Sequence, residues 1–156
     1  MNGKRKAIAH IDLHIHSALA PLFLDRIDLH IDVQPVDFDQ MSSTVPAESS
    51  EAIRQRVIAA RQIQTERYKD IKDVHCNAQM TSKLLHQYAE PDAEGLELLR
   101  DAMTRLNMSA RAYDRILKVA RTIADLDGCA QVMGRHVQEA ISYRNLDRAN
   151  WAETGW

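Results

Sequence analysis

The chain contains few aromatic residues and few cysteines. Aromatic side chains make up 5% of its 156 residues, too few for a platform on which single-stranded nucleic acid stacks. Neither of the two cysteines, Cys76 and Cys129, belongs to a CxxC pair. We therefore expect reduced thiols in a cytoplasmic protein, rather than a disulfide framework or a zinc site.

The chain also lacks a strong excess of charge and any long apolar run. Its formal net charge is -2 with both signs mixed throughout, which excludes the basic field of a dedicated nucleic-acid-binding protein. No apolar run reaches the roughly 18 residues that a membrane-spanning helix needs. The basic start at residues 1–6 is not followed by a continuous apolar stretch. We therefore predict neither a signal peptide nor a membrane partner.

The chain does contain a strongly periodic segment at residues 106–126. Its apolar residues recur at spacings of three and four, which predicts a helix with one buried face. That face comprises Tyr113, Ile116, Leu117, Ala120, Ile123 and Ala124. Ser109 stands at the N-cap position, and Gly128 follows the helix where a left-handed residue often ends it.

Arg111 is the unusual residue of this predicted helix. A cation in the first turn opposes the helix dipole, so the stability of the helix does not require it. An arginine beside the free amide groups of a helix start suits a phosphate group. The alternative is a surface arginine with a solvated head, and from the helix alone this is the simpler interpretation.

Four further segments are predicted to be helical. They span residues 50–68, 81–88, 92–106 and 135–143, with short connections that favour side-by-side packing. In the first of them, Ile53, Val57, Ala60 and Ile63 form the expected buried stripe, and Arg54, Arg56, Arg61 and Arg67 the expected solvated face. The length fits one domain. The predicted fold class is mainly α, a small helical bundle.

The residues before the helices alternate between apolar and polar side chains. This pattern, at residues 11–17 and 23–33, predicts one or two short strands in front of the bundle. Both segments contain the pentapeptide Ile-Asp-Leu-His-Ile, so one hypothesis is that they were joined in a rearranged gene. Residues 34–47 contain Pro35 and Pro46 and are interpreted as a linker.

Four segments, taken in order, resemble the C-terminal region of the magnesium-chelatase-related AAA+ ATPases of the ComM/YifB type. They are residues 23–31, Cys-Asn-Ala-Gln-Met at 76–80, residues 106–126, and Ala-Ile-Ser-Tyr-Arg-Asn-Leu-Asp-Arg at 140–148. The resemblance implies an AAA+ lid. It divides the chain into a leader outside the family's pattern (1–21), the last strand of an AAA+ core (22–33), a linker (34–47), the helical lid (48–148) and a tail (149–156).

The resemblance also implies roles for individual residues. Arg26, in Leu-Asp-Arg-Ile-Asp, is similar to the arginine finger, a catalytic residue that enters the neighbouring subunit's ATP site and stabilises charge on the transferring phosphoryl group. Arg111, in Ser-Ala-Arg, is similar to the sensor 2 arginine that contacts nucleotide from the lid, with Ser109 beside it. The alternative for Arg26 is a strand-edge arginine paired with Asp25 or Asp28.

The chain departs from this family in lacking the phosphate-binding machinery. It contains no G-x-x-x-x-G-K-[ST] loop, and no apolar strand ending in paired acidic residues precedes Phe23. ATP and Mg²⁺ belong to the intact family, and we expect neither to bind tightly to this chain alone. We also expect no ATPase activity without complete subunits. The implied partners are an ATPase core or neighbouring AAA+ subunits in a ring, which in ComM-like proteins remodels DNA.

A second and shorter resemblance covers residues 12–21. His14 and His16 are similar to the paired metal ligands that open PHP-type metal-dependent phosphoesterases, because alternate residues of a strand point the same way. The further ligands of such a site do not follow, so we interpret both as solvent-facing histidines and predict no metal site. A third interpretation of the whole chain is a non-enzymatic helical interaction module that binds no nucleotide.

Overall fold

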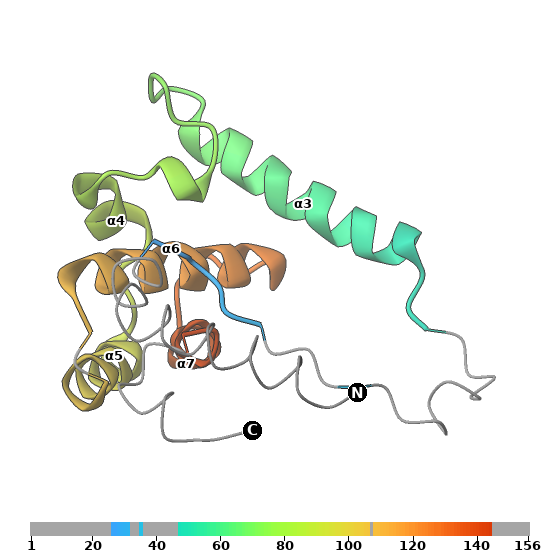
Figure 1. Cartoon of the computed structure of the whole chain (residues 1–156). Coiled ribbons are helices and arrows are strands. Elements are labelled where there is room, and N and C mark those ends of the chain that lie inside the picture. Colours follow the sequence, from blue (N-terminus) through green and yellow to red (C-terminus); the bar gives the residue numbers. More distant parts are fainter. Residues whose placement is uncertain (1–25, 32–34, 36–46, 107, 145–156) are drawn as a thin grey trace, which may run out of the picture.

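The computed structural model describes residues 26–31, 35, 47–106 and 108–144. These residues form five α-helices and one short 3-10 helix. In chain order they are α3 (Ser50–Tyr68), η1 (Asn77–Gln79), α4 (Ser82–Tyr88), α5 (Ala93–Arg105), α6 (Ala110–Leu126) and α7 (Gly134–Ser142). The predicted helical bundle is thereby confirmed, and the helix bounds agree with the sequence pattern to within one or two residues (Figure 1).

Helix α6 lies at the centre of the bundle and contacts α3, η1, α4 and α7. The apolar face predicted for it is confirmed, because Ile116, Leu117, Ala120 and Ala124 are all buried. Burying one side chain such as Ile116 stabilises the fold by roughly 1.5–3 kcal/mol. Past the helix end, Gly128 has a φ of 66°, the left-handed conformation that its position predicted.

Helices α5 and α7 approach each other closely at Gly95, in the first turn of α5. A Cβ atom at this position would lie 2.8 Å from Cβ of Pro91 and 3.1 Å from Cγ2 of Val137. The N-cap of α5 is Asp92, whose carboxylate accepts a hydrogen bond of 2.8 Å from the Gly95 amide. The Asp92 amide in turn donates to the Val132 carbonyl at 2.9 Å. The connection before α7 is thus fixed to the start of α5.

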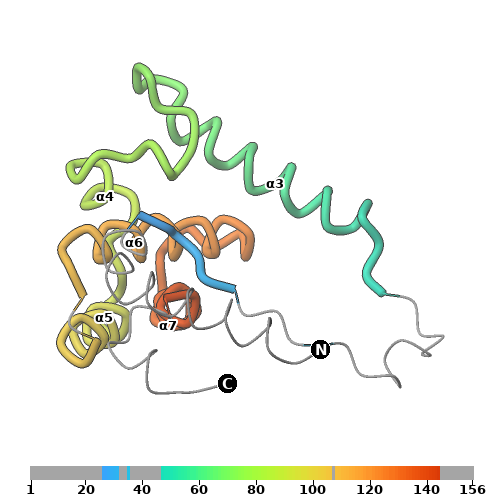
Figure 2. Tube along the Cα trace, viewed as in Figure 1, coloured from blue at the N-terminus to red at the C-terminus, as the bar shows by residue number. Residues whose placement is uncertain are grey.

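Helix α3 differs from the prediction in the face that it buries. Ala60 is buried as expected, but Ile53, Val57 and Ile63 remain 43%, 46% and 37% exposed. The buried residues besides Ala60 are Gln64 and Tyr68, which lie toward the C-terminal end of the helix. Figure 2 shows why: α3 diverges from the bundle toward its N-terminal end, so the first half of the stripe has no described neighbour.

The described part of the predicted strand at 22–33 is residues 26–31, and it forms no strand. A strand requires a second strand for its backbone hydrogen bonds, whereas here the His30 amide donates to the Tyr143 carbonyl at the end of α7 at 2.7 Å. The predicted strand at 11–17, the leader 1–21 and the tail 149–156 lie outside the described residues, as does nearly all of the linker 34–47.

Candidate nucleotide-contacting site

The start of α6 is an exposed helix N-terminus. Ser109 is the N-cap, with φ -76° and ψ 163°, and its hydroxyl accepts a hydrogen bond of 3.2 Å from the Ala112 amide. Ser109, Ala110 and Arg111 are all exposed, whereas Ala112 is buried against the bundle. The first turn therefore presents amide groups, a hydroxyl and a guanidinium on the surface, which is the chemistry that anions bind.

One turn further along α6, Arg115 forms an ion pair with Asp28. The Arg115 side chain is 25% exposed and that of Asp28 is 55% exposed. Residues four apart lie on the same helix face, so Arg115 and Arg111 share a face of α6. The ion pair therefore brings residues 26–31 to the face of α6 that carries Arg111, and Figure 1 shows this segment in blue beside the helix.

Arg26 begins this segment, two residues before Asp28, and is exposed. The sequence offered Asp28 as a partner for Arg26 itself, and the structure pairs Asp28 with Arg115 instead. The Asp28–Arg115 ion pair thus joins the segment that carries Arg26 to the helix that carries Arg111. No pattern in the sequence predicted this ion pair, because Asp28 and Arg115 are 87 positions apart.

A buried polar network near the C-terminal end of α6 fixes α3 to this helix. Its centre is the Asp125 carboxylate, which accepts hydrogen bonds from Arg67 (2.8 Å to Oδ2), from Asn77 (2.8 Å) and from Arg121 (3.1 Å). Arg121 also donates to the carbonyls of Cys129 and Ala130. Such a network is stable only because each charge has several partners.

This network corrects the interpretation of Arg67 as part of a solvated face. The side chain is only 12% exposed and pairs with the fully buried carboxylate of Asp125. It also donates a hydrogen bond of 3.0 Å to Oδ1 of Asn77. The error arose because a charged residue is usually solvated, and periodicity does not reveal a buried partner 58 positions away.

The network also explains the segment Cys-Asn-Ala-Gln-Met at 76–80. Asn77 is 2% exposed and joins three elements. Its amide group donates to Thr122 at 3.0 Å as well as to Asp125, its oxygen accepts from the Tyr68 hydroxyl at 2.8 Å, and its backbone N–H donates to Gln64 at 3.2 Å. Asn77 therefore has a structural role, because its hydrogen bonds hold α3 against α6.

The charges of the network shift the pKa values of its members. Burial alone raises the pKa of Asp125, but hydrogen bonds from Arg67 and Asn77 and the charges of Arg121 and Arg67 outweigh it, so the pKa lies below its ordinary value. The hydrogen bond to Asp125 raises the pKa of Arg67. Burial lowers the pKa of Arg121. Asp125 is therefore held as a carboxylate.

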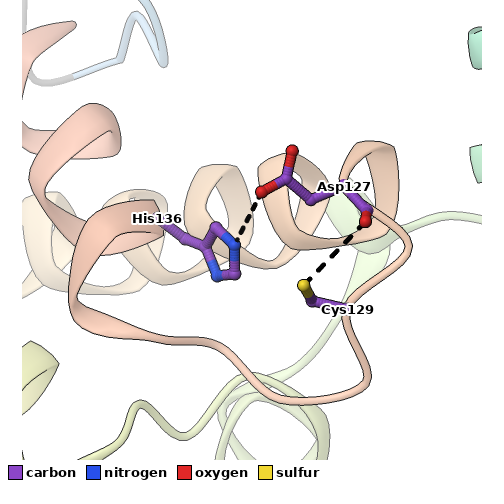
Figure 3. Close-up of side chains that lie close together, drawn as sticks. All are labelled: Asp127, Cys129 and His136. Atoms are coloured by element: carbon purple, nitrogen blue, oxygen red, sulfur yellow. Dashed lines mark hydrogen bonds and ion pairs between the residues drawn. The ribbon is translucent and has the colours of Figure 1, made fainter.

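A second cluster lies in the connection between α6 and α7. Asp127, Cys129 and His136 offer ligand atoms within 4.8 Å of one another, a spacing that could hold a metal ion (Figure 3). His136 is 1% exposed, and its Nε2 lies 3.2 Å from Oδ2 of Asp127. Both cysteines of the chain are free.

The contacts of this cluster favour a protein-only network over a metal site. The Arg135 guanidinium lies 3.1 Å from the Cys129 sulfur and 3.4 Å from the Asp127 carboxylate, so a cation already bridges these two groups. Nδ1 of His136 accepts a hydrogen bond of 3.0 Å from the Met133 amide. The ring hydrogen then belongs on Nε2, the atom that a metal would need as a ligand.

Two other expectations from the sequence concern metal binding and membrane spans. His14 and His16, the residues of the second resemblance, lie outside the described residues. Among the helices that the structure describes, none has both the length and the apolar character needed to cross a membrane.

Comparison with known protein families identifies the family to which the bundle belongs. The family described as "Magnesium chelatase, subunit ChlI C-terminal" matches residues 47–144, more than half of the chain and all of the described helices. The chain belongs to this family. The bundle is therefore a C-terminal lid segment of a magnesium-chelatase-related AAA+ protein.

Individual relatives support the same assignment. The chain is 40% identical over 127 residues to the YifB protein of Escherichia coli (strain K12), a match that covers 81% of this chain and 24% of the relative. It is 39% identical over 127 residues to the competence protein ComM of Haemophilus influenzae, with the same shares covered. The chain thus spans about a quarter of the length of these relatives, and the resemblance to the ComM/YifB type is confirmed.

Proposed function

We propose that this chain supplies two arginines to the ATP sites of an AAA+ ring, with Arg111 as the sensor 2 residue and Arg26 as the arginine finger. Arg111 contacts nucleotide phosphate from the start of α6, beside Ser109. Arg26 enters the site of the adjoining subunit and stabilises the charge that develops on the transferring phosphoryl group. Each arginine offers a planar fork of donors suited to phosphate.

The observation that carries the proposal is the position of Arg111 in the exposed first turn of α6, beside the amide groups of the helix start. The side chain opposes the helix dipole there, as the sequence indicated. Ser109 caps the helix, with its hydroxyl accepting a hydrogen bond from the Ala112 amide. The Asp28–Arg115 ion pair supports a common role for the two arginines, because it fixes the Arg26 segment to the Arg111 face.

ATP and Mg²⁺ require groups that this sequence does not supply. It contains no Walker A loop to surround the triphosphate and no paired acidic residues after an apolar strand to hold the metal. The residues present fit one part of the site only, the contact with phosphate oxygens. We therefore propose that the chain hydrolyses ATP only together with an ATPase core, and that the purified chain shows no turnover.

The test is a chimera in which this chain replaces the matching stretch of the Escherichia coli YifB protein. We expect ATP turnover in the chimera, a loss on the order of 100-fold in Arg111→Ala, and at least the same loss in Arg26→Ala. The matched control is Arg105→Ala, which removes an exposed arginine whose ion pair within the described residues is with Asp101 on α5. Its turnover should equal that of the unaltered chimera.

The competing function is a helical interaction module that binds no nucleotide. It predicts that neither Arg111→Ala nor Arg26→Ala changes ATP turnover of the chimera by more than the control does. Thermal unfolding of each variant separates this outcome from misfolding. Unchanged turnover in both variants, with folding intact, would overturn the nucleotide-contacting proposal.

A further inference from the structure

Three contacts tie residues 26–31 to the helical bundle. Arg115 of α6 pairs with Asp28, the Arg144 guanidinium donates a hydrogen bond to the Ile27 carbonyl, and the His30 amide donates to the Tyr143 carbonyl at 2.7 Å. The apolar side chains of the segment are partly exposed, since Ile27, Leu29 and Ile31 are 43%, 45% and 71% exposed. Polar contacts and the buried His30, which is 5% exposed, therefore hold this segment.

Arg144 is the unusual member of this set. It lies just past the C-terminal end of α7 and is only 1% exposed, the burial of a core residue. A buried guanidinium is unfavourable unless it is well bonded. Here the guanidinium donates a hydrogen bond to the carbonyl of Ile27, which lies 117 positions earlier in the chain. Arg115, with 25% of its side chain exposed, holds the same segment from α6.

We propose that Arg115 and Arg144 are positioning residues for Arg26, which act by holding residues 26–31 on α6 and the end of α7. This proposal rests on the function proposed above. The Ile27 carbonyl and the Asp28 carboxylate adjoin Arg26, so the two contacts fix the backbone that carries its guanidinium. A shift of the bundle, for example when nucleotide reaches Arg111, then moves Arg26 with it.

The first experiment measures amide hydrogen exchange at His30 in the full chain by NMR. The unaltered chain should protect this amide, because it is bonded to Tyr143. Arg115→Ala should raise the exchange rate of His30 at least about fivefold and leave the Ala120 amide, within α6, unchanged. The double variant Asp28→Arg with Arg115→Asp should restore protection to within about twofold. Arg105→Ala is the matched control and should change neither amide.

Arg144→Ala removes a buried side chain and is expected to destabilise the whole fold, so the test uses the Arg115 variants. An unprotected His30 amide in the unaltered chain would overturn the proposal. So would an unchanged rate in Arg115→Ala, or a rise that the reversed pair does not restore. An effect on Ala120 as large as that on His30 would indicate a general loss of stability and would also overturn it.

The chimera distinguishes failure of this proposal from failure of the proposed function. If Arg115 positions Arg26, Arg115→Ala lowers kcat at least about tenfold with little change in KM, and the reversed pair recovers it. Loss of kcat in Arg26→Ala but not in Arg115→Ala overturns the positioning role and leaves the function standing. Full turnover in Arg26→Ala overturns the function of Arg26 and, with it, a positioning role in catalysis.

Discussion

Asp28 and Arg115 form an ion pair that joins the N-terminal described segment to the central helix of the bundle. The pair is partly solvated, so its direct contribution to the free energy of unfolding is small, about 0–1 kcal/mol. Its importance is geometric, because it sets residues 26–31 beside the start of α6. The position of Arg26 relative to Arg111 therefore depends on how residues 26–31 lie against α6.

Asp125 carries the strongest prediction about stability. Asp125→Asn leaves Arg67 and Arg121 buried without their carboxylate, and removing one partner of a buried ion pair destabilises by about 3–5 kcal/mol. Urea unfolding at neutral pH measures the change. The matched control is Asp101→Asn, whose exposed pair with Arg105 should contribute less than about 1 kcal/mol. Equal losses in the two variants would contradict the account of the network.

The lowered pKa of Asp125 predicts how this contribution depends on pH. The folded-state pKa lies below the unfolded value of about 3.9. The stabilisation is therefore complete above the unfolded value and is lost as the pH falls through the folded value. NMR titration of the Asp125 carboxyl carbon in the folded chain measures this directly. A midpoint above about 3.9 would refute the prediction.

Gly95 permits the close approach of α5 to α7. Gly95→Ala places a methyl group 2.8 Å from the rigid ring of Pro91. Overpacking destabilises by about 1–3 kcal/mol, whereas the higher helix propensity of alanine returns up to about 1 kcal/mol. We expect a net loss of about 1–2 kcal/mol in urea unfolding. The control Glu97→Ala, at an exposed position of the same helix, should change the free energy of unfolding by no more than about 0.5 kcal/mol. A gain in stability for Gly95→Ala would show that the helices can separate and would contradict the prediction.

The exposed stripe of α3 predicts a weak effect where the sequence alone predicts a strong one. Ile53→Ala and Val57→Ala should each change the free energy of unfolding by less than about 1 kcal/mol, because both side chains are largely exposed. Leu99→Ala, at a position 1% exposed in α5, should lose about 2–5 kcal/mol. Losses in α3 as large as that of Leu99→Ala would mean that the N-terminal half of the helix is covered by the rest of the chain.

Local signals in the sequence were sufficient to predict the helices. Ser109 caps α6 and Gly128 adopts the left-handed conformation, both as expected, and Ser49 and Asp92 cap α3 and α5. Each of these features depends on neighbours within one turn, which the sequence contains. The apolar face of α6 was predictable for the same reason, since a central helix is covered on the side where its apolar residues lie.

Features that depend on distant partners were not predictable. Ile53 and Val57 have the spacing of a buried stripe, yet burial requires a neighbour that the spacing does not specify. Arg67 was assigned to solvent because its carboxylate, Asp125, comes from another helix. Of the candidate site, the sequence and the family resemblance supplied Arg26, Ser109 and Arg111. They did not supply Arg115 or Arg144, whose contacts are with a segment about a hundred positions away.

The central claim is that Arg26 acts on ATP held by the adjoining subunit, and mixed rings of the chimera test it most directly. One partner carries Arg26→Ala. The other keeps Arg26 but lacks the lysine of the phosphate-binding loop contributed by the YifB protein. Each is expected to be nearly inactive alone. Mixing them should restore ATP turnover, because intact arginines then meet intact nucleotide sites across shared interfaces, and a mixture no more active than the sum of its parts would contradict the account.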